Sequence, residues 1–209
     1  MIRCHILMRV VAVFLVAGCD ATKKPAAPPV PIAALALPGN EYMPTQLGTK
    51  WLFQSPEGRK STHEIVASVE VANSMHITVL TADEDQDKYE IKYVVNKTGL
   101  YIAKNHDVEY DPAYQVLVLP HVKGEEWKRP KQKSDGAKQN FTALAAEVIK
   151  IGSISVEAIG VEHLTTISPL AMYGRRWYAP KIGLVKLESW VSDDTFRVIW
   201  ELQSYELGK

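Results

Sequence analysis

The chain has 209 residues, and its 24 basic and 24 acidic side chains leave no formal net charge. This balance gives no electrostatic basis for binding nucleic acid or an anionic lipid surface, so neither is expected through charge alone. Hydrophobic residues make up 46% of the chain. Its length suits one domain with a core that requires neither disulfides nor a structural metal.

The N-terminus has the pattern of an export signal. Arg3 and Arg9 precede an uninterrupted apolar run, Val10 to Ala17, which ends at Gly18 and Cys19. Positive charge, a short apolar run and a small-residue exit are typical of a secretory signal. The run is far shorter than the ~20 apolar residues of a membrane-spanning helix. We therefore expect residues 1–18 to be a signal peptide that is removed.

The end of this run, Leu15-Val16-Ala17-Gly18-Cys19, resembles the lipobox of bacterial lipoproteins. The resemblance implies diacylglycerol on the thiol of Cys19, cleavage between Gly18 and Cys19, and an N-acyl chain such as palmitate on the new amino group. No other cofactor is expected. The other cysteine of the chain, Cys4, lies in the removed segment, so the mature chain would keep Cys19 alone. Acylation would account for this lone cysteine. The alternative is an ordinary secretory signal with a chance cysteine at its exit.

Two acyl chains would hold the protein stably on a bacterial cell membrane, facing the periplasm. Asp20 resembles the sorting signal that keeps many Gram-negative lipoproteins in the inner membrane, so we favour the inner over the outer membrane. Residues 19–40 are rich in proline and alanine, which disfavours both helix and sheet and predicts an extended tether. The remaining residues, 41–207, are expected to form one β domain.

The domain alternates apolar and polar residues with a period of two, as half-buried antiparallel strands do. The turns between the alternating segments are short and polar, which favours hairpin connections. We expect an all-β fold: a single large curved antiparallel sheet or an open barrel of about ten strands. The expected strands lie near residues 50–55, 64–71, 75–79, 89–95, 100–104, 114–119, 153–166, 174–178, 183–191 and 196–203.

One segment leaves two alternatives open. Phe141, Leu144, Ala145, Val148 and Ile149 have helical spacing, so residues 139–151 could form one helix. The same segment could instead be a strand that runs toward Gly152, and we slightly favour the strand.

The globular part contains three motifs: Tyr42-Met43-Pro44 followed by Gly48-Thr49-Lys50-Trp51, then Gly124-Glu125-Glu126-Trp127, then the W-Y-A-P-x-V-G-x-V-K pattern at Trp177 to Lys186. Through these motifs it resembles a group of uncharacterised bacterial exported β-rich proteins and lipoproteins. Some members of this group are distantly similar to the half-barrel carriers of the lipoprotein sorting pathway. The resemblance implies a curved sheet but assigns no activity.

Trp127, Trp177 and Tyr178 are our candidates for a ligand or partner surface. No metal site or catalytic residue is expected. The carboxylates Asp83, Asp85 and Asp87 lack the other ligands of a calcium loop, and a second acidic patch, at residues 106–111, fits no known ligand spacing. The histidines are scattered over separate strands, and no hydrolase or phosphate-binding motif is present.

These observations favour a membrane-anchored envelope lipoprotein whose non-enzymatic domain binds an envelope protein partner or an apolar ligand. The alternative is a carrier that shelters a lipid or another apolar ligand in a half-barrel cavity. A hydrolase with an active site outside the known motifs is a further alternative, since such sites are recognised by geometry.

Overall fold

The computed structural model describes residues 41–84, 87–132, 136–192 and 195–209. The expected signal peptide, Gly18, Cys19, Asp20 and the tether lie outside the described residues. The regular secondary structure of the described residues consists of strands alone. None of these residues forms a helix that could span a membrane. The strands are β1 Lys50–Gln54, β2 Lys60–Val71, β3 Ser74–Asp83, β4 Tyr89–Asn96, β5 Gly99–Asn105, β6 Val108–Val118, β7 Glu126–Lys128, β8 Lys138–Ala143, β9 Glu147–Ile151, β10 Ile154–Ile167, β11 Leu170–Ala179, β12 Gly183–Ser192 and β13 Thr195–Glu206.

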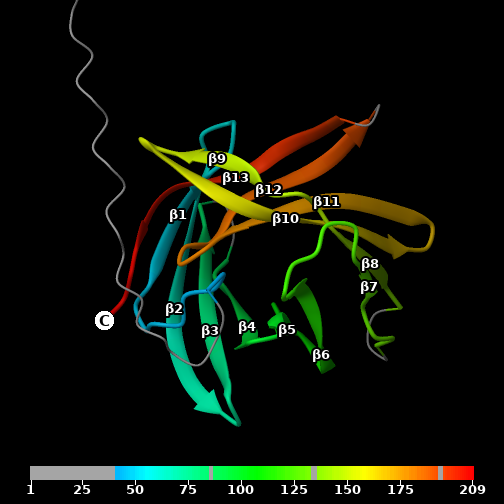
Figure 1. Ribbon diagram of the computed structural model, residues 1–209, viewed down its shortest axis with the longest axis horizontal. Coiled ribbons are helices and arrows are strands. Elements are labelled where there is room, and N and C mark those ends of the chain that lie inside the picture. The colour runs from blue at the N-terminus through cyan, green and yellow to red at the C-terminus, as the bar shows by residue number, and fades with distance from the viewer. Residues whose placement is uncertain (1–40, 85–86, 133–135, 193–194) are drawn as a thin grey trace, which may run out of the picture. The chain divides into compact units, whose positions relative to one another are not determined.

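All thirteen strands pair antiparallel in one sheet, as the alternating pattern predicts. Their order is β6-β5-β4-β3-β2-β1-β13-β12-β11-β10-β8-β7, with β9 paired to β10 beside this path. The first and last strands, β1 and β13, are neighbours in the middle of the sheet. In Figure 1 the strands β2 to β6 run across the direction of β10 to β13, so the sheet bends and its two halves face each other.

The three strands beyond the expected ten are β7, β8 and β9, and two of them replace the possible helix at residues 139–151. The helix alternative is wrong because two separate alternations lie end to end. Phe141 and Ala143 are buried on β8, and Ile149 and Ile151 are buried on β9. Three residues, 144–146, separate the strands, so the two alternations together imitate the spacing of a helix.

Much of the hydrophobic core lies on the face of the sheet that carries Val79, Ile91 and Tyr93, which we call the inner face. On β3, Met75, Ile77 and Val79 are buried at every second position. β1, β5, β6, β8, β11, β12 and β13 add further buried side chains to the same cluster. The core is therefore shared by both halves of the bent sheet.

The two edges of the sheet, β6 and β7, meet through side chains. Nε1 of Trp127 donates a hydrogen bond to the carbonyl oxygen of Gln115 at 3.0 Å. Gln132 bonds the backbone of Asp111 and Pro112 at 3.2 and 2.9 Å. No backbone ladder pairs β6 with β7 or β8 among the described strands, so the sheet is curved but not closed.

Candidate ligand-binding site on the inner face

A cavity of about 260 Å³ lies between the two halves of the sheet, and we call it the inner cavity. Its walls come from β1 to β5 on one side and from β11, β12 and β13 on the other. The volume is slightly below the ~300–1,000 Å³ of typical small-molecule pockets. Most lining side chains are apolar or aromatic, among them Trp51, Phe53, Ile91, Leu100, Ile102 and Trp200.

The alternation of the strands places these side chains at the cavity. Tyr89, Ile91 and Tyr93 occupy successive inward positions of β4, and Arg176 and Tyr178 occupy inward positions of β11. Inward positions normally hold hydrophobic residues, because a buried polar group is costly unless it is hydrogen-bonded. A charged Arg176 at such a position is therefore the main departure from the core pattern.

Arg176 lies among tyrosine hydroxyls. Burial by itself lowers the pKa of Arg176, but Tyr178, Tyr114 and Tyr93 act in the opposite direction and the net pKa is raised. A hydrogen bond also joins the guanidinium to Tyr178. Among the described residues no carboxylate forms an ion pair with Arg176. The inner cavity therefore contains a cation that has phenol partners but no carboxylate in ion-pair contact among the described residues.

Two tyrosines beside Arg176, Tyr93 and Tyr178, are protonated at neutral pH. Burial raises the pKa of Tyr93, with a smaller contribution from Tyr178, and burial likewise raises the pKa of Tyr178 against the opposing effect of Arg176. A protonated phenol can both donate and accept a hydrogen bond. Tyr93 and Tyr178 can therefore donate to an acceptor placed beside Arg176.

A second polar group lines the cavity near the β2–β3 pair. Nε2 of His63 lies 3.1 Å from Oγ of Ser61, and the His63 ring packs against Phe53 with centroids 4.8 Å apart. Burial lowers the pKa of His63 to about 4, with Asp83 opposing the shift. Ser61 pairs directly with Asp83 across the ladder. At neutral pH His63 is therefore uncharged.

Two further cavity residues, His106 and Asn105, lie at the end of β5. His106 stacks on Tyr89, with ring centroids 3.6 Å apart and planes 12° from parallel. Oδ1 of Asn105 is buried and has no hydrogen-bond partner within the described residues. The cavity thus offers an unused acceptor as well as an unpaired cation.

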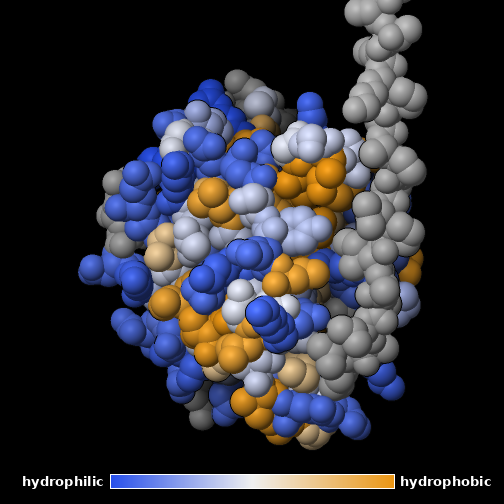
Figure 2. All heavy atoms as spheres, turned by 90° about the vertical axis from the view of Figure 1, so that its left-hand side faces the viewer, coloured by the Kyte–Doolittle hydropathy of each residue, from blue (hydrophilic) through white to orange (hydrophobic). Residues whose placement is uncertain are grey.

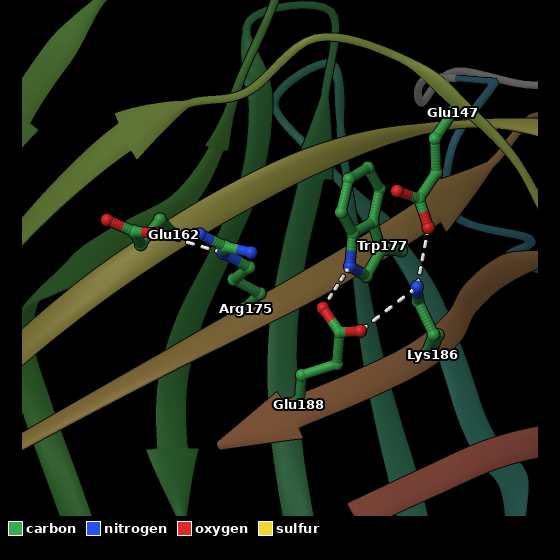
Figure 3. A network of polar contacts seen from close by, with 6 residues as sticks. All are labelled: Glu147, Glu162, Arg175, Trp177, Lys186 and Glu188. Atoms are coloured by element: carbon green, nitrogen blue, oxygen red, sulfur yellow. Dashed lines mark hydrogen bonds and ion pairs between the residues drawn. The ribbon is translucent and has the colours of Figure 1, made fainter. Parts of the chain in front are cut away.

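Of the three side chains proposed from sequence as a ligand or partner surface, only Tyr178 lines the inner cavity. Trp177 is buried on the opposite, outer face, where its ring covers Gly160 and its Nε1 donates to Oε2 of Glu188 at 2.8 Å. Lys186 completes this group by contacting Glu188 at 3.1 Å and Glu147 (Figure 3).

Trp127 is half-buried and is not among the residues that line the inner cavity. It stacks on Phe141, with ring centroids 5.4 Å apart, and holds the two sheet edges together as described above. The described residues contain no group of three or more His, Cys, Asp or Glu side chains arranged to hold a metal. Asp85, one member of the acidic run, lies outside the described residues.

Sequence reasoning missed Arg176, Ser61 and His63. The expected strand began at residue 64, whereas β2 begins at Lys60, so the shared face of Ser61 and His63, two apart on that strand, was not recognised. Nothing local marked Arg176, since the alternation of β11 does not reveal which face bounds a cavity.

The fold is similar to that of two solved structures. One is a protein described as exported, with a YmcC-like fold, from Bacteroides fragilis: the TM-score is 0.56 at 14% identity, over 80% of this chain and 99% of the other. The second is described as a lipoprotein from Parabacteroides distasonis, with a TM-score of 0.50, 14% identity and the same coverage. At this identity the likeness shows the fold alone. No protein-family model matches the chain, and no curated protein matches its sequence.

Proposed function

We propose that this protein is an envelope lipoprotein, anchored by acyl chains on Cys19, whose β domain binds a small, mainly apolar ligand in the inner cavity. The observation that carries the proposal is the cavity itself, a volume of about 260 Å³ with mostly apolar and aromatic walls. A core built only for stability is close-packed and leaves few voids larger than a water molecule. This cavity is equivalent to roughly nine water molecules at ~30 Å³ each.

The face of the molecule drawn in Figure 2 gives less support to a protein partner than the cavity gives to a ligand. On the face shown in Figure 2, hydrophobic side chains form separate groups between hydrophilic ones, and no single continuous apolar patch is visible. Protein interfaces usually contain a contiguous apolar centre. We therefore favour the apolar-ligand carrier over the partner-binding domain.

Export and anchoring rest on the lipobox resemblance, and the similar folds of an exported protein and a lipoprotein are consistent with them. Mass spectrometry of the mature protein from its own host should find acylated Cys19 at the N-terminus. Cys19→Ala should move the protein from the membrane fraction to the soluble fraction. An unmodified thiol on a chain that still carries residues 1–18 would contradict the anchor.

Ligand binding is tested with 1-aminoanthracene, a neutral fluorophore whose emission rises in apolar pockets. We expect saturable binding to the β domain and its loss in Leu100→Trp, which fills the cavity. The exposed Val148→Trp is the matched control and should bind normally. Unchanged fluorescence in the wild-type protein would contradict the proposed function.

A hydrolase is a second candidate because of one observation, the contact between Ser61 and His63 at the cavity wall. A neutral histidine beside a serine hydroxyl is the geometry of a general base and its nucleophile. Reaction with a fluorophosphonate probe decides between the two functions. Labelling that disappears in Ser61→Ala would favour the hydrolase, and no labelling is expected for a binding protein.

A further inference from the structure

Two consecutive arginines of β11 have opposite surroundings. Arg175 lies on the outer face, where its Nε and Nη2 both lie 2.9 Å from Oε2 of Glu162 and its guanidinium covers the ring of Phe196 at 3.7 Å. Arg176 lines the inner cavity, and within the described chain it has no carboxylate partner. The charge of Arg175 is therefore balanced by the protein, whereas that of Arg176 is not.

The other charged or titratable groups near Arg176 do not neutralise it. Tyr93 and Tyr178 lie beside it as neutral phenols, because burial raises the pKa of both hydroxyls. His163 is uncharged, because burial, and secondarily Arg176, lower its pKa to about 3. Asp83 is the one carboxylate in the cavity lining, but it acts on His63 and Tyr89 and is not among the groups that act on Arg176.

An unpaired cation beside an apolar wall favours a ligand that carries one negative charge and an apolar chain. A guanidinium matches a carboxylate or a phosphate with two parallel hydrogen bonds, and such charge-assisted bonds are among the strongest in proteins. Tyr93 and Tyr178 can donate further hydrogen bonds to the same oxyacid. Leu100, Ile102 and Trp200 provide the apolar surface for the chain.

We infer that the inner cavity binds an anionic amphiphile, with its oxyacid head group at Arg176 and its alkyl chain against the apolar wall. This assignment rests on the proposed function, because it requires the cavity to hold a ligand. It goes beyond that function by naming the chemical class of the ligand and the residue that selects it.

The test is displacement of 1-aminoanthracene by decanol, decanoate and decyl phosphate at neutral pH. The three ligands share an alkyl chain and differ in the head group. We expect at least one of the two anions to bind the wild-type domain tenfold or more tightly than decanol. The stronger anion identifies the head group as carboxylate or phosphate.

Arg176→Gln should remove this preference and leave decanol binding unchanged, and the retained decanol binding shows that the variant is folded. Arg175→Gln, which alters the outer face of the same strand, should keep the preference. Tyr178→Phe, which removes one hydroxyl, should reduce anion binding severalfold.

The outcomes separate the two proposals. Equal binding of all three ligands by the wild-type domain would overturn the anionic ligand and leave the apolar cavity as a binding site. A preference for anions that survives Arg176→Gln would overturn the role of Arg176. Failure of 1-aminoanthracene and of every competitor to bind would overturn both proposals.

Discussion

Trp51 donates a hydrogen bond from its indole Nε1 to the carbonyl oxygen of Ile182 at 2.6 Å, across 131 positions of the sequence. The two residues belong to two of the motifs that carry the family resemblance. A side chain added at Gly183, in the same turn, would contact Pro44, Met43 and Trp51. The first and third motifs therefore contact each other, and their residue types are explained by this packing.

Loss of this hydrogen bond should destabilise the domain. Trp51→Phe keeps an aromatic ring but leaves the buried carbonyl of Ile182 without its donor, which costs about 1–3 kcal/mol. Urea unfolding followed by circular dichroism measures the change. Trp190→Phe, at a position 40% exposed, is the control and should change the stability by less than about 0.5 kcal/mol. Similar effects of the two substitutions would contradict the contact.

Gly99 should tolerate no side chain. Its φ is +147°, and an added Cβ would lie 1.9 Å from the backbone oxygen of Leu117 on β6. Gly99→Ala must therefore displace the β5–β6 ladder, and we expect a loss above about 3 kcal/mol. Gly124→Ala has a matched positive φ of +86° but meets nothing within 4 Å, so only about 1–2 kcal/mol of backbone strain is expected. Thermal unfolding of both variants would reveal the difference.

The stability should fall between pH 6.5 and pH 4. His63 is neutral in the folded protein because burial lowers its pKa to about 4, whereas an unfolded histidine binds a proton near pH 6.5. In this interval the unfolded state holds more protons, so acid favours unfolding by an amount on the order of 1–3 kcal/mol. Below pH 4 both states are protonated and this contribution no longer changes.

His63→Asn should reduce the slope of stability against pH in that interval, measured by urea unfolding at several pH values. The part due to His163, whose pKa burial lowers to about 3, should remain. His76→Gln, on an exposed position of β3, is the control and should leave the slope unchanged. An unaltered slope in His63→Asn would mean that His63 does not contribute.

If the protein is anchored as proposed, Asp20 should determine the membrane in which it resides. Asp20→Ser removes the residue that resembles the inner-membrane retention signal and should shift the protein to the outer membrane, with acylation of Cys19 intact. Sucrose-gradient fractionation of the host envelope measures the distribution. Inner-membrane residence of both forms would show that Asp20 is not the sorting signal.

The pattern of alternating residues predicts most of the sheet, because an antiparallel strand with one buried face shows its period directly in the sequence. Strands such as β3 and β4, in which apolar residues recur at every second position, are evident for this reason. β8 and β9 were ambiguous because each is short and their combined spacing resembles that of a helix. β7 has only three residues, too few to display a period.

The candidate site was harder to predict because it depends on long-range register. Arg176 and Tyr93 belong to β11 and β4, which lie on different halves of the bent sheet. The sequence motif drew attention to Trp177 and Tyr178, and alternation places these two on opposite faces. Only the folded arrangement identifies the inner face as the one that bounds a cavity.

The meeting of β6 and β7 has a mechanical consequence for the sheet. Separating any other two neighbouring strands of the sheet would break a ladder of main-chain hydrogen bonds. Between β6 and β7 only side-chain hydrogen bonds of the described residues would break, such as those of the Trp127 indole and the Gln132 amide. Breaking each of these bonds costs a net free energy of about 1 kcal/mol. A force that opens the bent sheet would therefore separate β6 from β7 first, while the rest of the sheet keeps its register.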